Sequence, residues 1–453
     1  MIIACAGKLI PLGVASIRPI AAFAGSTGCT FGRDEDAEAF AVSVSAFGRI
    51  GTGNDAVILE RALATGRAVR IPAGTTLTIA SDIRLQPGQV LFGEGAESRI
   101  QLRSNHAADN VKLRLADRTT IRDLHVEEVG AIGRTGLYGT ILAEGASHCA
   151  IRRVEVSGSS STGMMFIAST HIKVDGCHVH DTMADGIHAQ RGSQGIAIAD
   201  CRIERTGDDG IAFVSHGFDQ HGSVAQCSAR HCTITDVRTT GSGVAVIGVT
   251  DTTVVDCQIS GTPMSGIRIT SATFGAEGAT ICRRVTVTGN TVEHAGIGPA
   301  IGNNGGIFVE GARDITIAAN RIVAPRSWGI ATSNIVRDIR ITGNVIDAPG
   351  DVGMFISTAP GDDGYRRMWH ADDPAATLAS SDVTIDGNTI TRPVAAGIHV
   401  GGLPGFPSSD VIVRANIIQA IQPGPGRSIP RAVRVDPDAG IVILSNNRIV
   451  AVP

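Results

Sequence analysis

A glycine followed by alternating apolar positions recurs along most of the chain. The copies begin at Gly163 and then at positions 186, 210, 243, 266, 306, 329, 353 and 397, and the commonest interval is 23 or 24 residues. A period of this length is typical of solenoids, in which one unit buries its apolar side only by stacking on its neighbours. The longer intervals predict insertions, or one extra turn hidden between two copies.

A second motif lies between the first ones and reads apolar-x-apolar-x-x-(Cys or Asn)-x-apolar. Examples are "IKVDGCHV", "VTVTGNTV" and "IRITGNVI". Alternation with period two indicates strands, so we count two short strands in each unit. An antiparallel sandwich would show hairpin spacing of about 8 to 12 residues without a fixed repeat. The sequence therefore predicts an all-β right-handed parallel β-helix.

The cysteines follow the repeat. Cys177, Cys201, Cys232 and Cys257 occupy the motif position that Asn290, Asn320, Asn344, Asn388, Asn416 and Asn447 occupy later. Coils stack about 4.8 Å apart, so equivalent residues should form columns. An asparagine amide can bond neighbouring backbone in such a column, and a cysteine there is a small buried filler. We therefore assign these cysteines to packing and not to a metal site or disulfides.

Composition and charge exclude several classes of partner. The net charge is -4, and 56 glycines with few aromatic residues favour short strands and tight turns. There is no basic field for nucleic acid, and no run approaches the ~18 to 20 apolar residues of a membrane-spanning helix. Residues 1–43 are apolar and rich in small residues at their start. We interpret them as the remnant of an export signal or an ordinary N-terminal segment, and residues 44–453 as the β-helix. The first interpretation implies a periplasmic or extracellular location.

The stretch "VSAFGRIGTGNDAVILERAL", followed by "GRAVRIPAGTTLTI", resembles the segment that leads into the coils of the pectate-lyase-like β-helix superfamily. The resemblance implies that residues 55–65 form a short amphipathic helix that caps the open end of the solenoid. Asn54 or Asp55 should lie near its N-cap, in a structural role.

Outward positions of the glycine strands bring polar residues together. The residue two places after each glycine should point outward, which gives His188, Ala212, Ala245 and Arg268 on successive coils. The residues directly before the glycines are Asp185, Asp209, Ser242 and Ser265, and Asp208 precedes Asp209. Stacking should therefore gather these aspartates, His188 and Arg268 over about four coils, roughly 15 Å.

The order of these motifs resembles polygalacturonase-like glycoside hydrolases over residues 183–271. Met183-Ala184-Asp185, Gly207-Asp208-Asp209, Gly241-Ser242-Gly243 and Arg268-Ile269-Thr270 stand where that family has Asn-Thr-Asp, Gly-Asp-Asp, Gly-His-Gly and Arg-Ile-Lys. The family's histidine is replaced by Ser242 and its lysine by Thr270, which disfavours polygalacturonate as substrate.

By this resemblance the residues take defined roles. Asp208 would be the general acid, Asp185 with Asp209 would hold the attacking water, and Arg268 would bind a sugar carboxylate. Inverting hydrolysis requires room for that water between the carboxyl groups. The alternative is that "GDDG" only closes a turn, since Asp before Gly is a favoured turn pair, and that His188 is an ordinary surface histidine.

Three insertions, 214–227, 271–284 and 357–381, each follow a glycine strand and would wall one groove. The last holds Tyr365, Arg366 and Trp369, which would stack on a sugar and bind an acidic group, or form a lid on the coil below. His216 is a further candidate for substrate binding. With Asp219 and His221 it offers the alternative of a Ca²⁺ site; otherwise no cofactor or metal is expected.

We therefore expect a carbohydrate-active protein whose paired aspartates hydrolyse a polysaccharide or oligosaccharide in a lateral groove. A polysaccharide lyase or epimerase with Arg268 or a histidine as base is one alternative. A non-catalytic, glycan-binding or tailspike-like β-helix is the other. Neither nucleic acid nor membrane is an expected partner, and the protein would be a monomer or a homotrimer.

Overall fold

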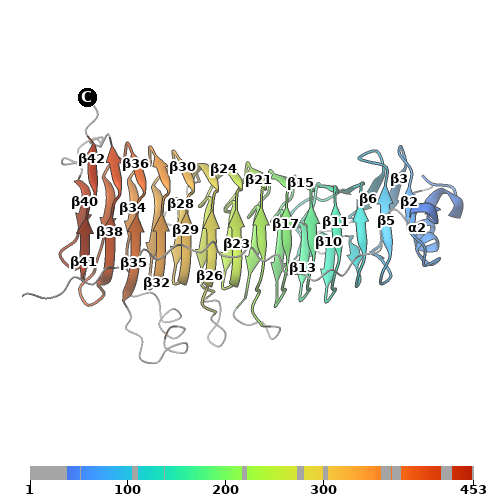
Figure 1. Ribbon diagram of the computed structural model, residues 1–453. Coiled ribbons are helices and arrows are strands. Elements are labelled where there is room, and N and C mark those ends of the chain that lie inside the picture. Colours follow the sequence, from blue (N-terminus) through green and yellow to red (C-terminus); the bar gives the residue numbers. More distant parts are fainter. Residues whose placement is uncertain are drawn as a thin grey trace, which may run out of the picture. The chain divides into compact units, whose positions relative to one another are not determined.

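The computed structural model describes residues 38–51, 53–104, 111–136, 138–216, 222–272, 280–298, 305–358, 369, 379–419 and 431–450. By internal contacts the chain divides into Met1–Phe40 and Ala41–Pro453. The second unit is a stack of coils in which each coil contributes one strand to each of three parallel sheets (Figure 1). This confirms the predicted right-handed parallel β-helix.

Strands three apart in the chain are neighbours in each sheet. The 15-stranded sheet consists of β1 (Val42–Ser43), β2 (Val69–Ile71), β5 (Val90–Gly93), β8 (Thr120–Arg122), β11 (Ala150–Arg152), β14 (Lys173–Asp175), β17 (Ala197–Ala199), β20 (Ser228–Arg230), β23 (Thr250–Val255), β26 (Arg283–Thr288), β29 (Arg313–Ala318), β32 (Arg337–Thr342), β35 (Ser380–Asp386), β38 (Ser408–Arg414) and β41 (Val442–Ser445).

The glycine motifs form the 13-stranded sheet. Its strands are β4 (Ile83–Arg84), β7 (Leu113–Leu115), β10 (Gly139–Glu144), β13 (Thr162–Ile167), β16 (Ile187–Gln190), β19 (Ile211–Val214), β22 (Val244–Ile247), β25 (Ile267–Thr270), β28 (Gly305–Glu310), β31 (Trp328–Ser333), β34 (Val352–Ile356), β37 (Ala396–Val400) and β40 (Arg431–Val435).

The third sheet has 14 strands. They are β3 (Thr76–Ile79), β6 (Arg99–Arg103), β9 (His125–Val129), β12 (Glu155–Ser157), β15 (His178–His180), β18 (Arg202–Glu204), β21 (Thr233–Thr235), β24 (Gln258–Thr262), β27 (Thr291–Ala295), β30 (Arg321–Val323), β33 (Val345–Asp347), β36 (Thr389–Thr391), β39 (Ile417–Gln419) and β42 (Arg448–Val450).

The count of two strands per unit was wrong, because the second motif spans two strands and a tight corner. In "IKVDGCHV", β14 ends at Asp175 and β15 begins at His178, with Gly176 in the left-handed conformation (φ 60°) between them. The long intervals are insertions and hide no extra turn, because β25 pairs directly with β28 and β34 with β37.

The recurring glycine is required by the close approach of neighbouring coils. A Cβ on Gly186 would lie 2.5 Å from Ile203 Cγ2 and 2.6 Å from the carbonyl oxygen of Gly210 in the next coil. Atoms of this kind do not approach so closely, so any larger residue would push the 13-stranded and 14-stranded sheets apart. The glycine therefore fixes the corner at which the candidate site lies.

The predicted asparagine column is confirmed as a continuous ladder. Asn320 Nδ2 donates to Asn344 Oδ1 at 3.0 Å, and Asn344 Nδ2 donates in the same direction to Asn388 Oδ1 at 3.0 Å. The backbone N–H groups of Asn320 and Asn344 donate to the same oxygens. The ladder runs from Asn290 to Asn447, and the N–H of Cys257 donates to Asn290 at its start.

The cysteines of the column are buried and unpaired, as predicted for packing residues. Seven cysteines in the described part of the chain are free thiols. Outside the column, burial raises the pKa of the Cys227 and Cys282 thiols to about 12. They therefore remain protonated and unreactive at neutral pH.

A short helix closes the N-terminal end of the coils. Helix α2 (Ala56–Leu63) follows the 3-10 helix η1 (Val44–Phe47), and it buries Leu59 and Leu63 in the core. Asp55 is its N-cap residue, but the Asp55 carboxylate bonds the N–H groups of Gly51 (3.0 Å) and Thr78 (2.9 Å). Asp55 thus ties the helix to β3, which agrees with the structural role expected for it.

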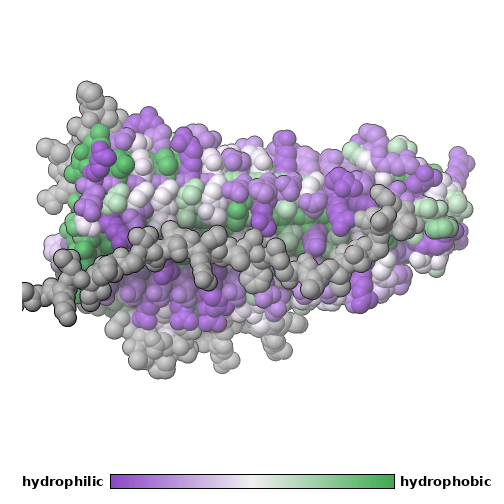
Figure 2. Space-filling model, in the orientation of Figure 1, coloured by the Kyte–Doolittle hydropathy of each residue, from purple (hydrophilic) through white to green (hydrophobic). Residues whose placement is uncertain are grey.

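Surface character differs along the stack. Hydrophilic side chains cover most of the coils, and apolar residues gather at the end that holds β40 to β42 (Figure 2). There Ile441, Ile443, Leu444 and Ile449 are exposed. No helix in the described ranges combines the length and apolar character needed to cross a membrane.

A candidate carboxylate site at one corner of the coils

The outward row of the 13-stranded sheet is the one that the sequence predicts. His188, Ala212, Ala245 and Arg268 are paired in register from β16 through β25. The row continues to Phe308 on β28, then to Ala331, Phe355 and His399. Ala212, Ala245, Phe308 and Ala331 in this row are buried, whereas Phe355 and His399 are partly exposed.

Three carboxylates meet where the chain turns from the 14-stranded to the 13-stranded sheet. Asp185, Asp208 and Asp209 each offer one oxygen, and these oxygens lie within 4.8 Å of one another. The N–H of Gly186 donates to the carbonyl of Asp209 at 3.0 Å, which stacks the Asp209 turn on the Asp185 turn. The aspartates that close these turns are therefore also the ones that form the carboxylate cluster.

Crowding and burial make part of this cluster favour its protonated form. The pKa of Asp208 is raised by burial and then by the charge of Asp185, against the opposing effect of Arg134. The pKa of Asp209 is raised well above its ordinary value by burial and by the two neighbouring carboxylates. The cluster is therefore able to hold a proton that an isolated aspartate would have lost.

His188 is oriented by one member of the cluster. Its Nδ1 lies 2.7 Å from Asp185 Oδ2, and its Nε2 is buried without a hydrogen-bond partner among the described residues. A carboxylate that accepts the Nδ1 proton leaves the lone pair of a neutral imidazole on Nε2. His188 is thus arranged as a histidine whose second nitrogen can accept or deliver a proton.

Arg134 belongs to the site and is not apparent from the repeat. Its Nη1 lies 3.2 Å from Asp208 Oδ2, and its side chain is about half exposed. It comes from the segment between β9 and β10, ahead of the first glycine motif, where the sequence shows no periodic signal that would align it with Asp208.

Ser242 and Arg268 contribute in different ways. Ser242 is fully buried, and it reaches Asp209 through its backbone N–H, which donates to Asp209 Oδ1 at 2.6 Å. The sequence also places Ser242 among the candidate substrate-binding residues; its hydroxyl is buried without a hydrogen-bond partner among the described residues, and that role stays a prediction. Arg268 acts on the carboxylates by charge and lowers the pKa of Asp209 against the stronger effects of burial.

The insertion residues are only partly described. Trp369 is fully buried, and the Arg337 guanidinium lies 4.9 Å from its ring centroid. This geometry corresponds to the lid interpretation, and the stacking of Trp369 on a sugar stays a prediction. His216 is partly buried where the first insertion leaves β19, outside the carboxylate cluster. Tyr365, Arg366, Asp219 and His221 lie outside the described residues.

An aromatic surface extends the same outward row. The rings of Phe355 and His399 are 4.8 Å apart between centroids, and those of Trp328 and Phe355 are 5.7 Å apart. These three side chains are partly exposed. They offer ring faces of the kind that sugars stack on, several coils beyond Arg268.

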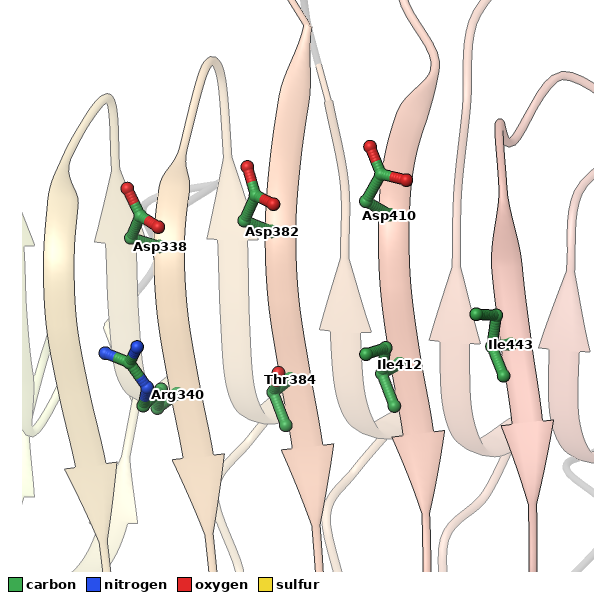
Figure 3. Close-up of a pocket in the computed structure, with 7 residues that line it drawn as sticks. All are labelled: Asp338, Arg340, Asp382, Thr384, Asp410, Ile412 and Ile443. Carbon is green, nitrogen blue, oxygen red and sulfur yellow. The ribbon is translucent and has the colours of Figure 1, made fainter. Parts of the chain in front are cut away.

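A hollow of about 300 Å³ lies elsewhere, on the 15-stranded sheet (Figure 3). Asp338, Asp382 and Asp410 line it in a row, with φ angles of 54°, 56° and 55°. Aspartate is among the few residues that adopt this left-handed conformation readily, which explains the row without a function. We therefore place the candidate site at the carboxylate cluster and not at this hollow.

Comparison with known proteins gives the family. The family model described as "Right handed beta helix region" matches residues 110–281, 217–364 and 281–452. The chain belongs to this family. A pre-neck appendage protein of Bacillus phage B103 is 28% identical over 193 residues, which cover 39% of the chain and 22% of that protein. This β-helix chain thus spans about a fifth of the curated relative's length.

Solved structures of similar fold include enzymes and a phage protein. The catalytic domain of a GH87 alpha-1,3-glucanase has a TM-score of 0.61 and 17% sequence identity. The match covers 89% of the β-helix chain and 67% of the glucanase chain. The A-module of a mannuronan C-5 epimerase from Azotobacter vinelandii has a TM-score of 0.61 and 16% sequence identity. The match covers 91% of the β-helix chain and 99% of the A-module. The pre-mature gene product 12 of bacteriophage phi29 has a TM-score of 0.67 and 13% sequence identity. The match covers 91% of the β-helix chain and 56% of the phage protein. At these identities the similarity shows the fold alone.

Proposed function

We propose that the protein is a carbohydrate-active enzyme that cleaves a polysaccharide on the outward row of the 13-stranded sheet, at Asp185, Asp208 and Asp209. The observation that supports this is the convergence of three carboxylates, two of them with raised pKa values, beside an exposed arginine. The aromatic surface around Phe355 lies on the same row, where further sugar units of a long substrate would bind.

The chemistry follows from the shared proton. A protonated carboxyl, Asp208 or Asp209, donates its proton to the glycosidic oxygen while the C–O bond breaks. An ionised carboxylate of the cluster, for which Asp185 is suited, attacks the anomeric carbon and forms a glycosyl ester. Water then displaces this ester and gives its proton to the carboxylate that acted as the acid. Arg134 and Arg268 offset the charge that remains, and they would hold an acidic sugar in place.

The spacing of the carboxylates bears on the stereochemical outcome. Typical inverting pairs are about 6.5–9.5 Å apart and retaining pairs about 5–5.5 Å. Oxygens within 4.8 Å of one another are nearer to the second arrangement. We therefore favour a retaining over an inverting hydrolase, which is read from the anomeric configuration of the first product by NMR.

The second candidate is a lyase or epimerase, and His188 favours it. A base that removes the proton at C5 of a uronate needs a free lone pair near a group that neutralises the sugar carboxylate. The buried Nε2 of His188, with Asp185 on Nδ1, provides the first, and Arg268 in the same row provides the second. His188→Gln would then abolish turnover, whereas in the hydrolase it would lower turnover much less.

The test is product analysis on alpha-1,3-glucan, alginate, polygalacturonate and neutral glucans. New reducing ends alone indicate hydrolysis, unsaturated uronate indicates a lyase, and inversion at C5 without cleavage indicates an epimerase. Asp208→Asn and Asp209→Asn should lower turnover about 100-fold or more. Asp175→Asn, an exposed carboxylate of the same coil, should leave turnover unchanged.

A non-catalytic role is the outcome that would overturn this proposal. If no substrate gives product, and glycan binding is equal in the native protein and in Asp208→Asn, the β-helix is a binding or structural module.

A further inference from the structure

We infer that Glu155, His178 and His180 form a binding site for a divalent transition cation such as Zn²⁺, on the outward face of the 14-stranded sheet. One potential ligand atom from each residue lies within 4.8 Å of the other two. The site is separate from the carboxylate site, and the proposed catalytic function does not depend on it.

The strand geometry creates the site. His178 and His180 are two apart on β15, so both side chains point outward, and their rings are 4.4 Å apart between centroids. Glu155 on β12 is the register partner of His178. Two histidines of one strand and a carboxylate of its neighbour thus converge without any loop.

The distances correspond to a metal-binding arrangement. His180 Nε2 lies 3.2 Å from Glu155 Oε1. Ligand bonds of about 2.0–2.1 Å at a tetrahedral angle place two ligand atoms roughly 3.3 Å apart. The side chains of Glu155, His178 and His180 are 29%, 35% and 16% exposed, so an ion can reach them and a water can complete its coordination.

The hydrogen bond behind His180 supports the assignment. His180 Nδ1 lies 2.7 Å from Asp181 Oδ2, and Arg205 holds that carboxylate through Nε and Nη2 at 3.0 and 2.9 Å. With Nδ1 directed at Asp181, the ring of His180 turns Nε2 toward the Glu155 carboxylate, and either a proton or a metal cation can lie between these two atoms. A carboxylate behind the ring is the usual partner of a metal-binding histidine.

The ligand set also selects the metal. Imidazole with one carboxylate suits Zn²⁺, Co²⁺, Ni²⁺ or Cu²⁺, whereas the all-oxygen cluster at Asp185, Asp208 and Asp209 suits harder ions such as Ca²⁺. Glu204 is less suited as a further ligand: its Oε1 lies 3.1 Å from His178 Nε2, but Arg202 and Arg205 bond its carboxylate.

The test is titration of the whole protein with Zn²⁺ by calorimetry, and with Co²⁺ by visible absorption. We expect one equivalent to bind with the weak d–d bands of nitrogen and oxygen ligands. Glu155→Gln, His178→Asn and His180→Asn should each weaken binding at least about tenfold. Asp181→Asn, which removes the charge behind His180 together with the ion pairs to Arg205 and Arg238, should weaken it by about 10–100-fold.

Two controls separate this site from the alternatives. His148 and His171 form another stacked pair, with ring centroids 4.8 Å apart, and are exposed; His148→Asn/His171→Asn should leave binding unchanged. The triple change Asp185→Asn/Asp208→Asn/Asp209→Asn should also leave it unchanged.

A measurement on the native protein covers the case in which a variant fails to fold. Zn²⁺ should protect His178 and His180, but not His148 and His171, from carbethoxylation as read by peptide mass spectrometry. Equal modification with and without Zn²⁺, or a thiolate-to-cobalt charge-transfer band that persists in His180→Asn, would overturn the inference.

Discussion

Asp209 is the residue whose charge is most constrained by its neighbours. It lies beside Asp185 and Asp208, and burial adds to their effect in raising its pKa. The N–H of Ser242 and the charge of Arg268 act in the opposite direction and favour its ionised form. Ionising such a residue at neutral pH lowers the free energy of unfolding, whereas its raised pKa keeps a proton at the site.

The stability of Asp209→Asn should therefore depend on pH differently from that of the native protein. A carboxyl whose folded pKa is raised binds its proton more tightly in the folded state, so unfolding free energy is lost as pH rises through the folded pKa. The loss amounts to about 1.4 kcal/mol for each unit by which the two pKa values differ. Urea unfolding between about pH 4 and about pH 8 should show a flatter profile for Asp209→Asn, and higher stability at neutral pH.

Asp175→Asn serves as the matched control, and its profile should follow that of the native protein. A lower stability of Asp209→Asn at neutral pH would mean that Ser242 and Arg268 outweigh the neighbouring carboxylates.

At the scale of single residues, the sequence predicts which residues align on neighbouring coils better than it predicts their hydrogen-bond partners. The outward row from His188 to Arg268 follows from period-two alternation and was confirmed. The aspartates were brought together by the same stacking. Arg134 was missed because its contact with Asp208 spans 74 residues and lies outside the repeat. The contact of the Ser242 backbone N–H with Asp209 was also missed, because a motif does not show whether a hydroxyl or a backbone N–H faces the site.

Among the elements, the asparagine ladder links the coils most directly. Asn344 Oδ1 accepts from the N–H of Asn320, and Asn344 Nδ2 donates to the carbonyl of Ile317 at 2.9 Å. These groups are buried, so no water replaces a lost partner. The ladder therefore stabilises the corner between the 15-stranded and 14-stranded sheets.

Asn344→Ala should lower the unfolding free energy by on the order of 3 kcal/mol, because it leaves the Asn320 N–H and the Ile317 carbonyl without partners. Denaturant unfolding monitored by circular dichroism measures the change. Arg340→Ala, an exposed position on β32 of the same coil, should change stability by less than about 0.5 kcal/mol. Equal effects of the two substitutions would show that the ladder is not a major source of stability.

The elements also show what periodicity alone does not resolve. The repeat length, the parallel pairing and the columns were all predicted, since they depend on residue spacing. The third sheet was not, because β14 and β15 are separated by only two residues and share one apolar pattern. A left-handed corner at Gly176 divides them, and alternation is continuous enough there to read as a single strand.

For the whole molecule, stability is distributed along the stack. Each coil contacts mainly the coil before and the coil after it, so interior coils are stabilised from both sides. At β41 and β42 the inward positions Leu444 and Ile449 are 49% and 68% exposed, although their register partners Val413 and Ile418 are fully buried. Local opening should therefore cost least at this end.

Hydrogen exchange read by mass spectrometry should follow this gradient. Amides of β41 and β42 should exchange much faster than those of β26 and β29, where coils pack on both sides. Peptides from β20 and β23, which are equally interior, provide the reference. Slow exchange at β41 and β42 would contradict the gradient and would indicate that Leu444 and Ile449 are covered in solution.

The ladder has one more property, which comes from its direction. Each asparagine of the ladder from Asn290 to Asn416 donates to the asparagine of the next coil, so the side-chain dipoles add along the axis of the solenoid. Backbone N–H groups of the previous coil donate to the same amide oxygens. These bonds fix the direction of the ladder, because a reversed amide would face a backbone donor with its own donor. The oxygen-bearing end of the ladder points toward Cys257, and the coils of the carboxylate site lie on that side.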